Sequence, residues 1–160
     1  MARFHFEAEA ATHVARARSV VWSWMSKLPD SLRAFPLIHD AIEIVPGKRY
    51  ELVLGPFGVK DFSMEVRAEM DVTAQAPREL VFTSVPGTGN TDMKVTLALE
   101  EAGASRTRVA VKLWVSPCAE VPRLMPVGMV AKAARATATV GLEQALKKAR
   151  HTLEAKTAGK

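Results

Sequence analysis

The sequence has little of what metal sites and disulfide-stabilised folds need. Its 160 residues include one cysteine, four histidines and one tyrosine, and only 6% are aromatic. No group of His, Cys, Asp and Glu has the spacing of a metal site, so no metal or other cofactor is expected. Cys118 stands alone, which excludes an internal disulfide and fits a reducing cytoplasm.

Long apolar runs and common catalytic motifs are also missing. The uncharged stretches are too short to span a bilayer, and residues 1–15 lack the apolar core of a secretory signal. The Gly-x-Ser-x-Gly elbow of hydrolases is absent. The segment Gly87–Asn90 lacks the Gly-Lys-Ser/Thr of a phosphate cradle and precedes a strand, so we interpret it as a hairpin loop. These absences favour a cytoplasmic protein without covalent chemistry.

The composition is that of one globular domain with unevenly placed charge. Hydrophobic residues make up 48% and charged residues 24%, and the formal net charge is +5. Residues 1–120 hold 14 basic and 15 acidic residues, whereas residues 121–160 hold 8 basic and 2 acidic ones. We interpret this C-terminal excess as a solvated helix face, with contact to an anionic membrane as the alternative. Nucleic acid is not expected, because no aromatic-interleaved basic surface accompanies the charge.

Alternating apolar and polar residues predict about seven short strands. Hairpin-length turns between them indicate an antiparallel meander. The segment Gly55–Gly58 is interpreted as a connecting loop, and Ile42 with Ile44 forms the apolar side of its strand. The strands are expected near residues 3–12, 42–44, 50–54, 62–72, 78–85, 93–99 and 109–115.

Two short helices and one long helix complete the pattern. The first is expected near residues 15–28 and ends at Pro29, and the second runs from Asp30 or Ser31 to Ala34. An apolar stripe from Val127 to about residue 154 predicts a long C-terminal helix. Burial of this stripe requires a curved sheet wrapped around the helix, which is an α+β fold. We expect a single domain over residues 1–155 and a flexible tail over residues 156–160.

Several segments, taken in order, carry a resemblance to a known superfamily. They are Val20–Trp22 with Met25, Pro29–Leu32, Phe35-Pro36, Ile42–Ile44, Pro77–Phe82 and Gly103–Val109. Together with the element order, they resemble the START-related helix-grip superfamily, which includes polyketide cyclases, lipid-transfer domains and pollen-allergen-type proteins. The resemblance covers nearly the whole chain, from Phe4 to about Leu153. It implies a hydrophobic-ligand cavity under the C-terminal helix, gated by Leu32, Phe35, the Gly55–Gly58 loop with Phe57, and the loop at residues 86–90.

Small residues in the helix stripe agree with such a cavity. Ala134, Ala138 and Gly141 face a sheet rich in methionine, whose flexible side chains suit an adaptable apolar site. The alternative is an ordinary dry core in which methionine fills gaps. Tyr50 is expected to bring its hydroxyl into the cavity or to its rim. The predicted ligand-binding residues are Leu32, Phe35, Tyr50, Leu52, Phe57, Met64, Met70, Met93, Val130, Ala134 and Ala138.

No catalytic residue is predicted. His5 lies on a polar strand face, and His39-Asp40 is interpreted as part of a polar loop near the gate. Trp114 is expected to point away from the core, where it packs locally or marks a homodimer face. The main hypothesis is binding, or transport, of a small hydrophobic or lipid-like ligand. A polyketide cyclase- or dehydratase-type enzyme and an interaction module that uses the basic helix are the alternatives.

Overall fold

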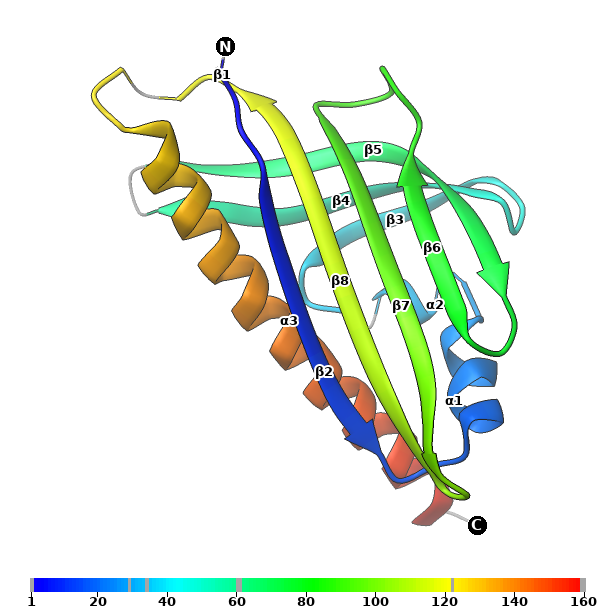
Figure 1. Ribbon diagram of the computed structural model, residues 1–160. Coiled ribbons are helices and arrows are strands. Elements are labelled where there is room, and N and C mark those ends of the chain that lie inside the picture. Colours follow the sequence, from blue (N-terminus) through cyan, green and yellow to red (C-terminus); the bar gives the residue numbers. More distant parts are fainter. Residues whose placement is uncertain (1, 29, 34, 60–61, 122, 159–160) are drawn as a thin grey trace.

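The computed structural model describes residues 2–28, 30–33, 35–59, 62–121 and 123–158, which form one antiparallel sheet, two short helices and one long helix (Figure 1). The strands are β1 (Ala2–Arg3), β2 (Phe6–Val14), β3 (Ile38–Val45), β4 (Arg49–Val59), β5 (Phe62–Gln75), β6 (Glu79–Ser84), β7 (Thr91–Gly103) and β8 (Arg106–Ala119). The helices are α1 (Arg18–Met25), α2 (Asp30–Arg33) and α3 (Val127–Ala158). The predicted α+β class, with a curved sheet and a long C-terminal helix, is confirmed.

The sheet is a meander with an interrupted first strand. Its order is β1-β8-β7-β6-β5-β4-β3, and β2 also pairs with β8. Strands β1 and β2 pair with successive parts of β8, as the partners Ala2↔Ala119 and Phe6↔Val115 show. The eight strands therefore fill seven positions, in agreement with the predicted number.

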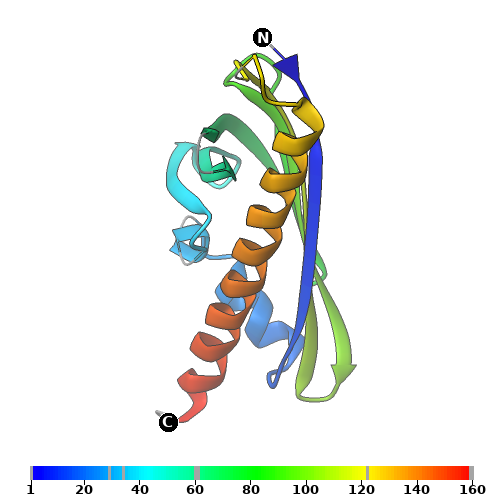
Figure 2. The ribbon, with the colours of Figure 1, turned by 90° about the vertical axis from the view of Figure 1, so that its left-hand side faces the viewer.

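The core lies between the concave face of the sheet and α3. In Figure 1, β7 and β8 run along the length of α3, whereas β4 and β5 cross towards its N-terminal half. Figure 2 shows how the sheet curls around the space beside the helix. Helix α3 packs mainly against β2 and β4. Alternate residues of β8 point inwards and are buried, as period-2 patterning predicts: Val109, Val111, Leu113 and Val115.

The apolar side of β3 was predicted wrongly. Ile42 and Ile44 are each 46% exposed, whereas Ala41 is buried. The reason lies in the next strand, where Tyr50 is buried directly opposite Glu43. A buried phenol needs a polar partner, and the carboxylate of Glu43 supplies it on the concave face. The isoleucines therefore face outwards.

The segment Gly55–Gly58 is not a loop but part of β4. The pairing register between β4 and β5 shifts between Leu54 and Phe57, which is a bulge that accommodates Pro56 without a backbone N–H. Phe57 is 0% exposed, and its ring centroid lies 5.2 Å from that of Phe6. This residue is a core side chain, and the prediction that it belongs to a gating loop is wrong.

The helix ends differ from the predicted ones. Helix α1 is shorter at both ends than residues 15–28, and α3 continues through residues 156–158, which were expected to be flexible tail. Pro29, Ala34 and residues 159–160 lie outside the described residues. Within the described part of the chain, no helix is long and apolar enough to cross a membrane.

Candidate functional site

An apolar cavity lies between the concave face of the sheet, α2 and the middle of α3. Its volume is about 40 Å³. Pockets for drug-sized ligands measure roughly 300–1,000 Å³, so this interior is nearly filled in the present conformation. Every side chain that lines the cavity is a hydrocarbon: Leu32, Phe35, Leu37, Ile38, Leu52, Leu54, Phe82, Val95, Leu97, Val111, Leu113, Leu142 and Ala145. The cavity offers apolar contact and no hydrogen bond from a side chain.

Leu37 separates this cavity from a groove on the surface. The groove has a volume of about 610 Å³, and Pro36, Pro56 and Val140 are among its lining residues. Leu37 lines both the cavity and the groove. We call these two spaces the interior cavity and the outer groove. The side chain of Leu37 therefore acts as a plug between them.

The plug is seated on a glycine of α3. A Cβ atom built on Gly141 would lie 2.4, 2.6 and 2.7 Å from the Cγ, Cδ1 and Cδ2 atoms of Leu37. Leu37 thus occupies the space that any other residue at position 141 would fill. Its backbone is also held, because the N–H of Gly55 donates to the Leu37 carbonyl at 2.9 Å. The bulge in β4 therefore positions the plug.

Helix α2 and the segment after it line one side of the cavity through Leu32 and Phe35. The hydroxyl of Ser31 donates to the carbonyl of Met25 at 2.7 Å, which fixes α2 against the end of α1. Ser31 is buried, so this bond satisfies a polar group that would otherwise be costly to bury. Leu32 and Phe35 are thereby directed at the cavity. Both residues were predicted as gate residues.

The other predicted ligand-binding residues fall into two groups. Leu52 lines the cavity together with Leu32 and Phe35. Tyr50, Phe57, Met70, Met93, Val130, Ala134 and Ala138 are buried in the core, and Met64 is half-buried, but none of these eight lines the cavity. The small residues of α3 permit the close approach of the helix to β2 and β4.

Tyr50 does not present its hydroxyl to the cavity. Its side chain is 1% exposed, and its hydroxyl donates to Oε2 of Glu43 at 3.1 Å. Burial is the main cause that raises the pKa of Tyr50 above its ordinary value, and the hydrogen bond to Glu43 adds to it. The tyrosine therefore stabilises the pairing of β3 with β4 and stays neutral.

The loop at residues 86–90 was expected to be part of the gate, and in the structure it is hydrogen-bonded along β5. The side chain of Asn90 accepts from the N–H of Arg67 at 2.8 Å and donates to the carbonyl of Glu65 at 3.0 Å. The hydroxyl of Thr88 accepts from the N–H of Glu69 at 3.0 Å. Gly89 lies so close to β5 that an added Cβ would be 1.7 Å from the carbonyl oxygen of Arg67. The loop extends the β5 ladder.

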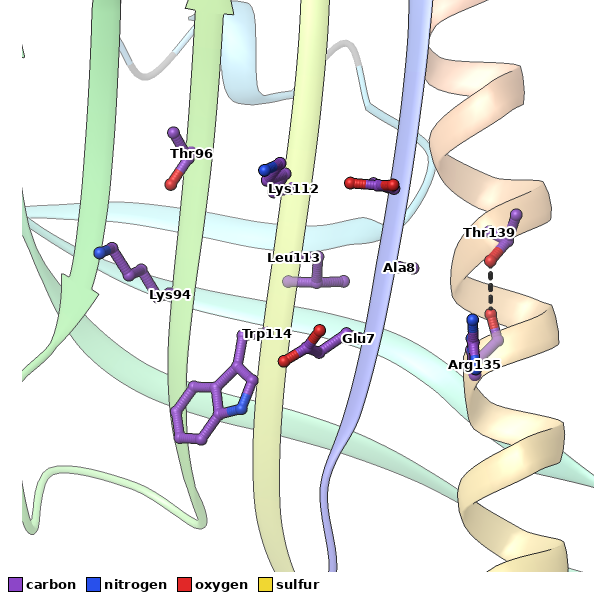
Figure 3. Close-up of a pocket in the computed structure, with 10 residues that line it drawn as sticks. Glu7, Ala8, Lys94, Thr96, Lys112, Leu113, Trp114, Arg135 and Thr139 are labelled. Carbon is purple, nitrogen blue, oxygen red and sulfur yellow. Dashed lines mark hydrogen bonds between the residues drawn. The ribbon is translucent and has the colours of Figure 1, made fainter.

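Trp114 points outwards, as predicted, and is 37% exposed. Figure 3 shows it on the outer face of β8 between Lys94 of β7 and Glu7 of β2, its partners in the strand register. These residues line a groove of about 490 Å³ that also includes Arg135 of α3. The face therefore combines an aromatic ring with both signs of charge. Self-association through it stays a prediction.

The histidines and the basic face of α3 are exposed. His5, His13, His39 and His151 all lie at the surface. His39 belongs to β3 and not to a loop, and its Nδ1 contacts the carboxylate of Glu65. The basic side chains on the outer face of α3 include Lys132, Arg135, Lys147 and Lys148. Contact of this face with an anionic membrane stays a prediction.

Leu37 was missed, and Gly141 was placed in the small-residue stripe but not among the predicted ligand-binding residues. A glycine inside a helical pattern often marks a close packing contact, and this was the available signal for Gly141. Leu37 follows Phe35-Pro36, but its sequence neighbourhood does not show that it reaches α3. The inward faces of β7 and β8 supply further lining residues, such as Val95 and Val111, which the alternation of these strands already placed in the core.

A curved antiparallel sheet around a long C-terminal helix, with an apolar interior between them, is the helix-grip fold of START-like proteins. No protein-family model matches this sequence, and no curated protein matches it either. Solved structures do match. The protein TTHA0849 from Thermus thermophilus is 16% identical with a TM-score of 0.73, over 94% of this chain and 98% of that chain.

Two further matches have informative names. A START superfamily protein from Mycobacterium smegmatis is 19% identical with a TM-score of 0.62, over 94% of this chain and 99% of that chain. The Zhui aromatase/cyclase from Streptomyces sp. R1128 is 14% identical with a TM-score of 0.59, over 96% of this chain and 93% of that chain. At these identities the likeness shows the fold alone. The resemblance stated from the sequence is confirmed at this level.

Proposed function

We propose that the protein binds a small hydrophobic molecule between the sheet and α3, and that the molecule enters from the outer groove past Leu37. One observation carries the proposal, namely that the same side chain lines the interior cavity and the outer groove. Displacement of this one side chain joins a cavity of about 40 Å³ to a groove of about 610 Å³. The joined space reaches the size of ordinary ligand pockets.

The lining defines the chemistry of the ligand. Because the interior cavity is surrounded by hydrocarbon, an apolar group gains roughly 25 cal/mol per Å² on entering it, whereas an unpaired polar group loses energy. Polar side chains occur only further out, where Thr137 and Gln144 line the outer groove. The proposed ligand therefore has an apolar body in the interior and tolerates a polar end at the groove.

Binding without chemistry fits this lining better than the cyclase or dehydratase alternative. General acid–base catalysis needs a titratable group within hydrogen-bond reach of the reacting atoms. No titratable side chain is among the described residues that line the interior cavity. Tyr50 is buried, but its hydroxyl bonds to the exposed Glu43, and neither residue lines the interior cavity.

A fluorescence titration with N-phenyl-1-naphthylamine, an uncharged apolar dye, tests the proposal. We expect saturable binding of one dye per chain. Leu37→Ala removes the plug and should tighten binding by about thirtyfold, because the free energy of displacing a buried leucine, about 2 kcal/mol, no longer opposes entry. Ala145→Leu places an isopropyl group in the interior cavity and should weaken binding by a similar factor.

Leu99→Ala is the matched control for Leu37→Ala. Leu99 is a buried leucine of β7 that lines neither the interior cavity nor the outer groove. Leu99→Ala removes the same side-chain atoms as Leu37→Ala, so it shows how much dye binding arises from destabilisation alone. Equal dye affinity in Leu37→Ala and Leu99→Ala, or unchanged affinity in Ala145→Leu, would show that the dye does not enter past Leu37 into this interior.

A further inference from the structure

A further hollow lies at the opposite end of the molecule from the N-terminus. In Figure 1 the end of β2, the β7–β8 turn and the C-terminal turns of α3 meet there. The hollow has a volume of about 630 Å³ and is lined by His13, Ala15, Arg106, Arg150, His151, Glu154 and Ala155. We call it the basic hollow. Four of its seven lining residues are basic, and they come from three separate strands and helices.

The guanidinium groups of the two arginines in the basic hollow are available to bind a ligand. Within the described part of the chain, the guanidinium groups of Arg106 and Arg150 have no hydrogen bond or ion pair. Several other arginines do have acidic partners, such as Arg3 with Asp92 at 3.0 Å, whereas isolated ones such as Arg78 do not share a hollow with a second arginine. Donor groups that converge on one hollow without an acceptor leave room for an external one.

The negative groups around the hollow are already engaged. Oε2 of Glu154 accepts a hydrogen bond from the N–H of Ala15 at 3.1 Å. Helix carbonyls near a C-terminus repel anions, but Arg16 donates from Nε to the carbonyl of Leu153 at 3.1 Å and from its other nitrogen to that of Glu154. With two arginines against one glutamate, the hollow carries a positive excess even when both histidines are neutral.

We propose that the basic hollow binds a phosphate dianion, either free or as the monoester of a small molecule or lipid headgroup. The guanidinium groups of Arg106 and Arg150 donate to the phosphate oxygens, in the charge-assisted geometry that arginine favours for phosphate. None of the residues of the basic hollow lines the interior cavity or the outer groove, so this site is independent of the hydrophobic one.

Side chains of three elements surround the basic hollow. Arg106 of β8 and His13 of β2 line it, and Arg108, the cross-strand partner of His13, is ion-paired with Glu100 at 4.0 Å. From α3, Arg150, His151 and Glu154 face the same space. Sulfate is a suitable second probe, because it carries two negative charges at neutral pH.

Isothermal titration of the full chain with inorganic phosphate and with sulfate tests the proposal. We expect saturable binding of one anion per chain. The double variant Arg106→Gln/Arg150→Gln should weaken binding by at least about tenfold, because it removes both charge-assisted donors of the basic hollow.

Lys112→Gln/Arg135→Gln is the charge-matched control. It lowers the net charge by the same amount, on exposed residues of the Trp114 groove that lie outside the basic hollow. The proposal predicts anion affinity within about twofold of the unmodified protein for this control. An equal loss in both double variants would show non-specific attraction, and no saturable binding of either anion would also overturn the proposal.

Vesicle sedimentation distinguishes the two sources of phosphate. Vesicles of phosphatidylcholine alone and with phosphatidic acid are compared, with the Arg106→Gln/Arg150→Gln protein alongside. Binding to the phosphatidic acid vesicles that these substitutions abolish identifies a lipid headgroup, and anion binding without vesicle binding identifies a soluble phosphate. If the Arg106→Gln/Arg150→Gln protein still binds the phosphatidic acid vesicles, another surface contacts the membrane, and the basic hollow is not a lipid site.

Discussion

The contact between Leu37 and Gly141 makes a quantitative prediction about stability. Gly141→Ala would place a methyl group 2.4–2.7 Å from three carbon atoms of Leu37, far inside ordinary contact distance. Overpacking of this kind costs about 1–3 kcal/mol, whereas alanine in a helix interior is favoured over glycine by about 1 kcal/mol. The net effect of Gly141→Ala in the unmodified protein is therefore a destabilisation of about 0–2 kcal/mol.

The same substitution should have the opposite sign once the plug is gone. Leu37→Ala alone should destabilise the protein by about 2–3 kcal/mol, near the lower end for buried leucines, since the site adjoins a surface groove. In a chain of this length that loss lowers Tm by about 5–10 °C. In the Leu37→Ala background the clash is absent, so Gly141→Ala should stabilise by about 1 kcal/mol. The coupling energy between the two positions is then about 1–3 kcal/mol.

Urea denaturation of the four proteins, followed by circular dichroism, measures this cycle. Gly128→Ala provides a parallel cycle, because a Cβ at Gly128 of α3 meets nothing within 4 Å and should be additive with Leu37→Ala. A coupling below about 0.5 kcal/mol at positions 37 and 141 is within ordinary additivity. Such a value would refute the plug contact and the entry route that depends on it.

Two further predictions concern the loop at residues 86–90 and the single tyrosine. Gly89→Ala should destabilise the protein by about 2 kcal/mol or more, because its Cβ would meet the backbone of β5. Gly128→Ala should instead stabilise it by up to about 1 kcal/mol. Similar urea denaturation midpoints for the two variants would contradict the close approach of Gly89 to β5. Because the pKa of Tyr50 is raised in the folded state, the unfolded chain loses this proton first as the pH rises past about 10, and stability falls there. Tyr50→Phe should reduce this loss of stability. Because the sequence has one tyrosine, an ultraviolet titration of the folded protein reports the pKa of Tyr50 directly. A pKa at or below the ordinary value in the folded protein would contradict the burial of Tyr50.

The fold could be predicted because period-2 patterning survives in the long central strands. The alternation that begins at Phe62 marks the start of β5, and the residues from Val109 to Val115 lie inside β8 with alternate side chains buried. The period-2 pattern failed at β3 and β4, where a polar contact or a bulge determined which side chains are buried. At β3 the buried hydroxyl of Tyr50 required Glu43 on the concave face, and at β4 a bulge carried Pro56 through a strand.

The site could be predicted only in part, because a small-residue stripe has two physical outcomes. Leu32, Phe35 and Leu52 were placed at the cavity by the helix-grip element order. Gly141 offers either a void or a seat for a side chain from elsewhere, and the sequence does not say which. The side chain that fills it, Leu37, comes from a segment about one hundred residues earlier. Long-range packing of this kind is decided by the backbone path, here by the Gly55 hydrogen bond to Leu37.

The closed interior also sets what an effective ligand must supply. If displacing Leu37 costs about 2 kcal/mol, the open conformation is populated at about 3%, and observed affinity is about thirtyfold weaker than that of the open protein. At roughly 25 cal/mol per Å², a ligand recovers this cost by burying about 80 Å² of additional apolar surface. Small fragments confined to a cavity of about 40 Å³ cannot do so, whereas a molecule that fills the interior cavity and continues into the outer groove can. Affinity should therefore rise with apolar length across a series of homologous ligands in both proteins, and Leu37→Ala should bind each ligand that reaches past position 37 about thirtyfold more tightly than the unmodified protein does.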